Sequence, residues 1–185
     1  IEAGTYIIAG ALLGNNLKIT NIIPKHVESL TEKLKEMGVP LTIKEDSIIV
    51  SKANNLKPVK VKTLGYPGFP TDLQQPLTTL LTQVNGTSTL EETIYENRFK
   101  NVEYLNKMGA NIEIIGQKIK IKGPTKLTGT NVEATDLRAG ACMVLAALIA
   151  DNTTTINSIE HVLRGYENII EKLSNVGAKI ELIDN

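Results

Sequence analysis

A motif that occurs three times constrains the fold of this chain more than any other feature of its sequence. The segments LKEMGVPLTI, LNKMGANIEI and LSNVGAKIEL each contain a leucine, a glycine four residues later and an apolar residue five beyond the glycine. The glycines are Gly38, Gly109 and Gly177, so the spacings are 71 and 68 residues. Upstream of each motif lie an apolar segment, a turn and a short strand-like segment. Repetition of this kind indicates a chain built from similar structural units, which we place at about 1–65, 66–130 and 131–185.

Each unit has the pattern of a helix, a strand, a second helix and then two strands. The first helices are apolar on nearly all sides, as in 139–150, and such helices are buried. The second helices carry Lys and Glu on one face, which favours the surface. Alternation in 111–123 predicts a β-hairpin. We therefore predict one α/β domain with pseudo-threefold packing, in which central helices are surrounded by sheets and the connecting tracts add further strands.

The composition narrows the possible partners. Twenty basic residues balance twenty acidic ones, which gives no general attraction for nucleic acid or a membrane surface. No apolar run reaches the roughly 18 residues of a membrane span. The single cysteine, Cys142, fits a reducing compartment such as the cytoplasm and, among small apolar neighbours, a structural role. His26 and His161 lack metal-ligand spacing, and there is no nucleotide-cofactor motif, so we expect no metal and no cofactor.

The segment FPTD, Phe69 to Asp72, introduces an apolar helix and has two interpretations. Thr71 or Asp72 can cap the free N–H groups of the first helical turn. A carboxylate at this position can instead accept a proton from a substrate hydroxyl. Pro76 cannot donate a hydrogen bond to the Asp72 carbonyl, which predicts a loosened opening turn.

The segment ATDLRAG, Ala134 to Gly140, repeats the Thr-Asp pair at the start of a second apolar helix. Asp136 has the position of a helix cap. Arg138 is harder to explain, because a cation is disfavoured near a helix N-terminus. It can meet a bound anion there, or form a local ion pair with Asp136 or Glu133.

Two further arginines are candidates because each is expected to open the second helix of its unit. They are Arg98 in ENRF and Arg164 in HVLRGYE. Surface ion pairs with Glu96 and Glu167 would be ordinary. Guanidinium groups also bind carboxylates and phosphates in a bidentate manner, and a symmetric fold can bring them to one end.

Six motifs, taken together, resemble a known enzyme family. IEAGTY, FPTDLQ, ETIYENRF, MGA, ATDLRAG and RGYENIIEKL are similar to segments of the UDP-N-acetylglucosamine 1-carboxyvinyltransferases, the enolpyruvyl transferases of peptidoglycan synthesis. The similarity covers the whole chain in order. It implies an α/β prism, or inside-out barrel, of βαβαββ-type units. Members of the family have two such domains with the active site between them, so we expect this chain to be the C-terminal part of a longer protein.

The resemblance assigns roles to individual residues. Asp72 matches the aspartate that contacts the sugar 3-hydroxyl and is the candidate base, and Arg164 matches the arginine that closes onto phosphoenolpyruvate. Ile94 matches a position whose main chain contacts the UDP-sugar. Three further residues match polar residues of the cleft, namely Arg98, Asp136 and Arg138.

The implied reaction transfers the enolpyruvyl group of phosphoenolpyruvate to UDP-N-acetylglucosamine, in the cytoplasm, with consequences for cell-wall synthesis, cell shape and division. The family's proton source lies in the other domain, so this chain alone is expected to be inactive. Two alternatives remain at this point. One is the sister activity, 3-phosphoshikimate 1-carboxyvinyltransferase, and the other is a non-catalytic interaction domain on the same scaffold.

Overall fold

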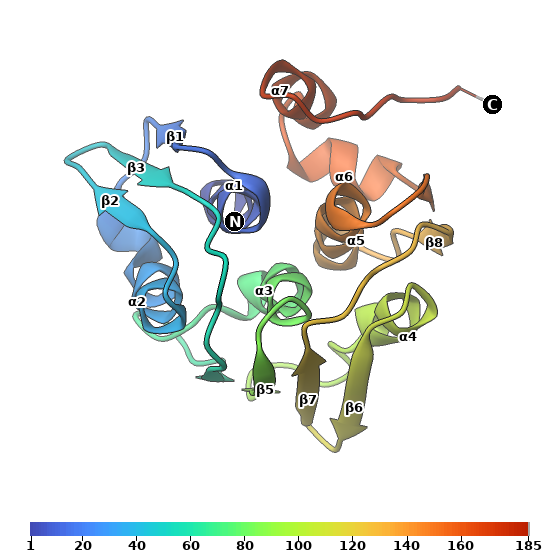
Figure 1. Ribbon diagram of the computed structural model, residues 1–185, viewed down its shortest axis with the longest axis horizontal. Coiled ribbons are helices and arrows are strands. Elements are labelled where there is room, and N and C mark those ends of the chain that lie inside the picture. The colour runs from blue at the N-terminus through green and yellow to red at the C-terminus, as the bar shows by residue number, and fades with distance from the viewer. Residues whose placement is uncertain (185) are drawn as a thin grey trace.

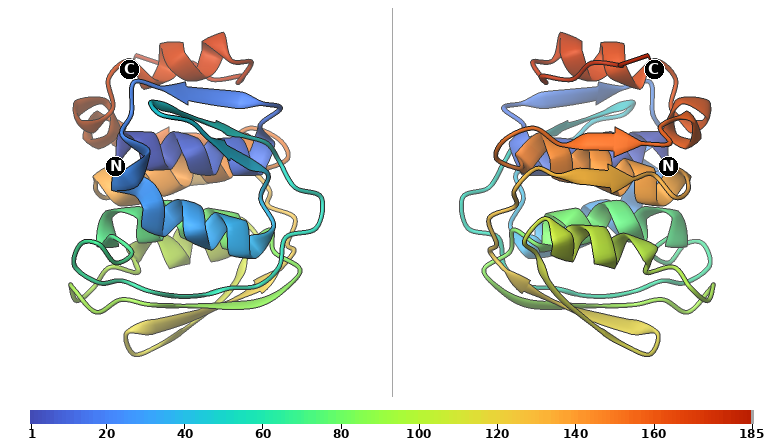
Figure 2. Two further views of the ribbon diagram at one scale, coloured as in Figure 1. Left: turned by 90° about the vertical axis from the view of Figure 1, so that its left-hand side faces the viewer. Right: turned by 90° about the vertical axis from the view of Figure 1, so that its right-hand side faces the viewer.

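Three central helices form the middle of the molecule in a computed structural model that describes residues 1–184. They are α1 (Glu2–Leu13), α3 (Gln74–Leu81) and α5 (Leu137–Ile149). Each packs against the other two, and the sheets lie outside them (Figure 1). Figure 2 shows that all three begin at the end of the molecule where the N-terminus lies. The predicted arrangement of buried helices inside surrounding sheets is therefore confirmed.

The starts of α3 and α5 differ, although both follow Thr-Asp. The α5 helix begins directly after Asp136, which caps it. In contrast, a 3-10 turn, η2 (Thr71–Leu73), precedes α3. Pro76 has no N–H to donate to the Asp72 carbonyl, which explains why the regular α-helical pattern begins only at Gln74. The loosened opening turn predicted from the sequence is thus present.

The second sheet contains the hairpin predicted for residues 111–123, and the first sheet contains the two strands expected after Gly38. In the first, the antiparallel order is β1-β3-β2, with bounds Leu17–Thr20 for β1, Leu41–Ile43 for β2 and Ser47–Val50 for β3. The second has the order β4-β5-β7-β6, with bounds Lys60–Lys62, Gly86–Glu91, Asn111–Ile115 and Lys118–Gly123 for β4 to β7 in turn. β4 runs parallel to β5, and the hairpin β6–β7 is antiparallel.

The third sheet contains only β8 (Asn131–Glu133) and β9 (Thr155–Asn157), which are parallel. The connecting tracts supply β4 and β8, as predicted. We also expected two strands after Gly177, but residues 178–184 form no strand. The reason is that a strand needs a backbone partner, as β6 has in β7, and residues 178–184 pair with no strand in the described part of the chain.

The second helices lie outside the central three. They are α2 (Glu28–Met37), which follows the short 3-10 turn η1 (Pro24–Val27), α4 (Lys100–Lys107), and two short helices in the third unit, α6 (Glu160–Gly165) and α7 (Ile169–Asn175). A single helix was expected in the third unit. It is broken because Tyr166 is extended and Asn168 is left-handed, with φ 52°.

The three glycines of the repeated motif have the same structural role. Gly38, Gly109 and Gly177 follow α2, α4 and α7 with φ of 92°, 114° and 104°. This left-handed conformation ends a helix without the steric cost that a Cβ atom would bring. The motif therefore marks the end of the second helix in each unit. None of the helices in residues 1–184 has the length and apolar character needed to cross a membrane.

Candidate active site

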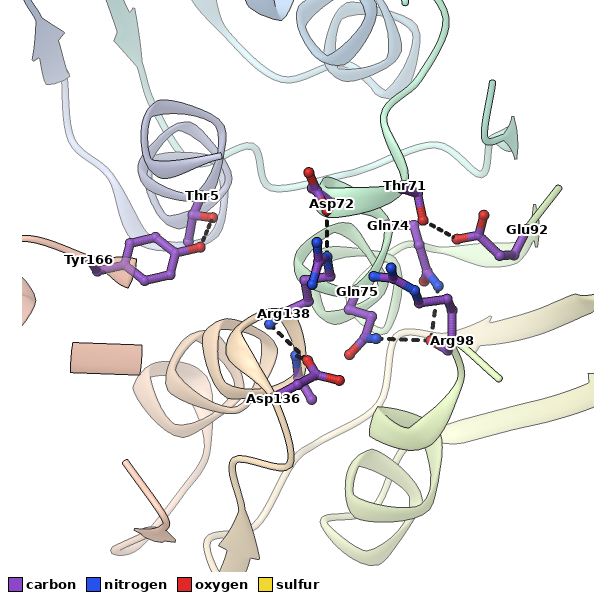
Figure 3. Close-up of polar contacts among 11 residues, drawn as sticks. Thr5, Thr71, Asp72, Gln74, Gln75, Glu92, Arg98, Asp136, Arg138 and Tyr166 are labelled. Carbon is purple, nitrogen blue, oxygen red and sulfur yellow. Dashed lines mark hydrogen bonds and ion pairs between the residues drawn. The ribbon is translucent and has the colours of Figure 1, made fainter. Parts of the chain in front are cut away.

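Asp72 and Arg138 meet at the end of the molecule where the central helices begin. The Nε atom of Arg138, the second residue of α5, donates to Oδ1 of Asp72 in η2 at 2.5 Å (Figure 3). The Arg138 and Asp72 side chains are 27% and 30% exposed, so water reaches both groups only partly. This ion pair joins the first turn of α5 to the turn that precedes α3.

The ion pair corrects two interpretations of the sequence. Asp72 does not cap a helix, because neither η2 nor α3 has a side-chain cap. Its carboxylate is instead bound to Arg138. The predicted local ion pair of Arg138 with Asp136 or Glu133 is also wrong. The Arg138 guanidinium instead reaches Asp72 in another unit. Sequence neighbours were considered as partners, whereas the true partner lies 66 residues away.

Asp136 is the helix cap that the sequence predicts. Its Oδ1 accepts hydrogen bonds from the backbone N–H groups of Arg138 and Ala139, both at 2.9 Å. These two bonds satisfy donors that a helix N-terminus otherwise leaves unpaired. They also fix the backbone from which the Arg138 side chain extends toward Asp72 (Figure 3).

Arg98 lies in the loop before α4 and is attached to the start of α3 through its backbone. Its carbonyl oxygen accepts from Nε2 of Gln74 and Nε2 of Gln75, each at 3.0 Å. Its guanidinium lies over the Tyr95 ring, 4.2 Å from the centroid, a cation–π geometry. The expected pair with Glu96 is not formed among the described residues. The two glutamines were missed, although adjacent buried amides at the start of an apolar helix are a signal for such contacts.

Glu92 was also missed by sequence reasoning. It follows β5 and is 1% exposed. One oxygen accepts from Thr71 Oγ1 at 2.6 Å, and the other accepts from Thr63 Oγ1 at 2.6 Å and from the Ile94 N–H at 3.0 Å. Burial raises the pKa of the Glu92 carboxyl, but these bonds and one from the Tyr95 N–H outweigh it, so its pKa lies below the usual value.

Within residues 1–184, no hydrogen bond or ion pair joins Ile94 or Arg164 to the Asp72–Arg138 pair. Ile94 is 43% exposed, and its backbone N–H is held by Glu92. Arg164 is an exposed residue in the last turn of α6, so it does not open the second helix as expected. It pairs with no carboxylate within residues 1–184, which includes Glu167. The α6 helix nevertheless lies at the end where the central helices begin (Figure 2).

A buried hydrogen bond ties the segment after α6 to α1. The hydroxyl groups of Thr5 and Tyr166 lie 2.8 Å apart (Figure 3). Burial raises the pKa of Tyr166, so the phenol stays protonated. Cys142 is fully buried, and burial raises the pKa of its thiol to about 11. The structural interpretation of this cysteine is therefore confirmed, since an unionised thiol is a poor nucleophile.

An open hollow of about 610 Å³ lies between the 92–100 loop and the tip of the β6–β7 hairpin. Its lining includes Arg98, Lys100 and Tyr95 from the loop and Gln117 from the hairpin. Asp72 and Arg138 do not line it. In residues 1–184, no group of three or more His, Cys, Asp or Glu side chains has the arrangement of a metal site.

A family model described as EPSP synthase (3-phosphoshikimate 1-carboxyvinyltransferase) matches residues 1–173. The chain belongs to the EPSP synthase family. Within this family it is 54% identical over 180 residues to UDP-N-acetylglucosamine 1-carboxyvinyltransferase 2 of Geobacillus kaustophilus, covering 97% of this chain and 42% of that protein. It is 53% identical over 184 residues to UDP-N-acetylglucosamine 1-carboxyvinyltransferase 1 of Streptococcus agalactiae, covering 100% of this chain and 44% of that protein. The chain thus spans less than half the length of these curated relatives.

Solved structures of an enolpyruvyl transferase and of an EPSP synthase share the fold. The enolpyruvyl transferase NikO from Streptomyces tendae matches with a TM-score of 0.90 and 30% identity, over 97% of this chain and 43% of that one. EPSP synthase from Acinetobacter baumannii matches with a TM-score of 0.77 and 20% identity, over 99% of this chain and 46% of that one. The predicted α/β fold and the resemblance noted in the sequence are both confirmed.

Proposed function

We propose that this chain is the substrate-binding half of an enolpyruvyl transferase that acts on UDP-N-acetylglucosamine and phosphoenolpyruvate. The observation that carries the proposal is the Asp72–Arg138 pair at the end where the central helices begin. The identity of 54% and 53% to proteins named for this activity supports the choice of substrate. In the cell, the reaction would be the first committed step of peptidoglycan synthesis, in the cytoplasm, and cell shape and division would depend on it.

The reaction needs a base at the sugar 3-hydroxyl. In the proposed reaction, the hydroxyl oxygen bonds to C2 of phosphoenolpyruvate while its proton passes to Asp72, and the methylene carbon gains a proton from an acid. The C2–O bond to phosphate then breaks, phosphate leaves, and the methyl group loses a proton to restore the double bond. Arg138 binds Oδ1 of Asp72, and no group within residues 1–184 forms a hydrogen bond with Oδ2. Oδ2 is therefore available to accept the proton of the substrate hydroxyl.

The anionic substrates require cations, and the proposal assigns these to the arginines at the same end. Arg164 is exposed and would close onto phosphoenolpyruvate, while Arg98, Asp136 and Arg138 would form the polar wall of the cleft. The backbone of Ile94 would contact the UDP-sugar. We further propose that residues 1–185 form one domain of three units, that the other domain and the proton source come from the rest of the polypeptide, and that the chain alone is inactive.

Two alternatives lead to different results in the same experiment. The description of the matching family model favours 3-phosphoshikimate as a second possible acceptor. The low identity of 20% to an EPSP synthase, against 54% to a UDP-N-acetylglucosamine transferase, argues for the sugar nucleotide. A non-catalytic interaction domain would release phosphate with neither acceptor.

The test is phosphate release by the complete protein supplied with phosphoenolpyruvate and each acceptor in turn. We expect release with UDP-N-acetylglucosamine and none with shikimate 3-phosphate. The Asp72→Asn variant should fold normally and lose about 10²-fold or more of turnover, the range expected for loss of a general base. Asp151→Asn is a matched control, because Asp151 pairs with Lys126 on the surface away from this end. Near-normal release by Asp72→Asn would refute Asp72 as the base.

A further inference from the structure

The Glu92 carboxylate is buried without a cation. It is 1% exposed, and within the described chain no Lys or Arg forms an ion pair with it. Burying a charged carboxylate is costly unless hydrogen bonds replace the lost water. Here the Thr63 and Thr71 hydroxyls and the Ile94 N–H do so at 2.6, 2.6 and 3.0 Å, together with the Tyr95 N–H. Two neutral groups could connect the same segments at lower cost, so the charge requires an explanation beyond packing.

Thr63, Thr71 and the Ile94 N–H come from separate segments, the first at the end of the first unit and the other two in the second unit. Thr63 follows β4 and also contacts residue 93, since the N–H of Thr93 donates to Thr63 Oγ1 at 2.8 Å. Thr71 begins η2 and directly precedes Asp72. The Ile94 N–H belongs to the loop after β5. Glu92 itself is fixed to the neighbouring hairpin, because its N–H donates to the Gln117 carbonyl at 2.8 Å.

Glu92 thus binds next to one candidate substrate contact, Asp72, and directly to another, the backbone of Ile94. One carboxylate oxygen binds the hydroxyl of the residue before Asp72, and the other binds the backbone of Ile94 (Figure 3 shows the bond to Thr71). Asp72 is held on its other side by Arg138. The turn that contains Asp72 is therefore held by two bonds. The Asp72 side chain binds Arg138 of α5, and the Thr71 side chain binds Glu92 at the end of β5.

We propose that Glu92 is a positioning residue, which sets the Asp72 turn at a fixed distance from the Ile94 loop so that the sugar 3-hydroxyl reaches the base. This inference rests on the proposed function. Its physical reason is that a general base needs near-contact geometry with the proton it removes, and small displacements can lower the rate by about 10²-fold. An ionised carboxylate suits this task because both oxygens accept, and a charged acceptor makes shorter and stronger hydrogen bonds than a neutral one.

The sharpest variant changes the donor and leaves the buried charge in place. Thr71→Val keeps the shape of the side chain and removes only the hydroxyl that reaches Glu92. Thr71→Ser keeps the hydroxyl and should restore the contact. The control is Thr82→Val, since the Thr82 hydroxyl also donates at 2.6 Å, to the Thr79 carbonyl, but at the opposite end of α3; Thr82 is buried and Thr71 half-buried, so the control should lose at least as much stability.

The experiment measures kcat, the KM for both substrates and the melting temperature of the complete protein. We expect Thr71→Val to lower kcat about tenfold or more, with the KM for phosphoenolpyruvate within about threefold of wild type. Its melting temperature should fall no further than that of Thr82→Val, whose kcat should stay near wild type. Thr71→Ser should recover most of the lost kcat.

The outcomes separate this inference from the proposed function. If the wild type is active and Thr71→Val keeps the kcat of the Thr82→Val control, the positioning role is overturned and the proposed function stands. The same holds if Thr71→Ser is as slow as Thr71→Val. If the wild type releases no phosphate from phosphoenolpyruvate with UDP-N-acetylglucosamine, both are overturned. A low kcat in Thr71→Val with recovery in Thr71→Ser supports both.

Discussion

A double-mutant cycle on Asp72 and Arg138 tests whether the ion pair of the candidate site is energetically significant. The cycle compares Asp72→Ala, Arg138→Met and the double variant, because neither single variant introduces a new polar partner. The measured quantity is the free energy of unfolding of the 185-residue chain in urea. The coupling energy is the part of the loss that the two single variants share.

The structure gives the expected magnitude. A hydrogen bond to a charged group contributes about 1.5–3 kcal/mol net, whereas fully exposed ion pairs contribute about 0–1 kcal/mol. The Arg138 and Asp72 side chains are 27% and 30% exposed, and the contact is 2.5 Å. Partial exposure calls for a discount from the buried value, so we expect a coupling of about 1–2 kcal/mol. The coupling should weaken in about 1 M salt, where the Debye length is about 3 Å, but should not disappear.

The control is the pair of Lys126 and Asp151, which meet at 3.0 Å with side chains 81% and 54% exposed. Its distance is ordinary for an ion pair, but solvent surrounds it, so its coupling should be near zero. If the Asp72–Arg138 coupling is no larger than that of the control, the reasoning from burial and distance is refuted. The pair would then be a surface contact of no consequence for the position of Asp72.

Two further predictions concern stability. Because the pKa of the Glu92 carboxyl is lower in the folded protein than its unfolded value of about 4.3, its contribution is present above that pH and is lost as pH falls through the folded value. Urea midpoints measured from pH 6 downward should therefore fall more steeply in the wild type than in Glu92→Gln, and equal slopes would contradict this. In Gly140→Ala, the new Cβ would lie 2.3 Å from Val162 Cγ2. Overpacking of about 1–3 kcal/mol should exceed the helix-propensity gain of about 1 kcal/mol. The melting temperature should fall, and Val162→Ala should recover part of the loss; no fall would show that α6 moves freely.

The arrangement of the fold was predictable because its signals are local and occur three times. Each helix-ending glycine lies in the left-handed region, and each apolar segment upstream became a buried helix. The prediction failed in the third unit, where Tyr166 and Asn168 interrupt the helix. At that break the Tyr166 hydroxyl forms a tertiary hydrogen bond with the Thr5 hydroxyl, 161 residues away. A local pattern contains no information about such a partner.

The candidate site was predictable only in part, for the same physical reason. Asp136 was predicted as a cap, and it is one, since the free N–H groups of its own helix lie next to it. Asp72 belongs to the same Thr-Asp pattern but does not cap a helix. The difference lies in its surroundings: a 3-10 turn before Pro76, and an arginine 66 residues away that takes its carboxylate. Glu92 was missed because its donors are brought to it by the sheet.

The polar groups at the starts of the three central helices differ, although the scaffold around them repeats. At α1, Thr5 binds Tyr166; at η2 before α3, Asp72 accepts from Arg138; at α5, Asp136 caps the helix. A substrate such as a sugar nucleotide has no threefold symmetry, so three identical helix starts could not contact three different chemical groups. The repeated fold brings three helix starts to one end, and the substitutions at those starts make that end suited to an asymmetric ligand. Symmetry therefore accounts for where the candidate site lies, and the departures from symmetry account for its chemistry.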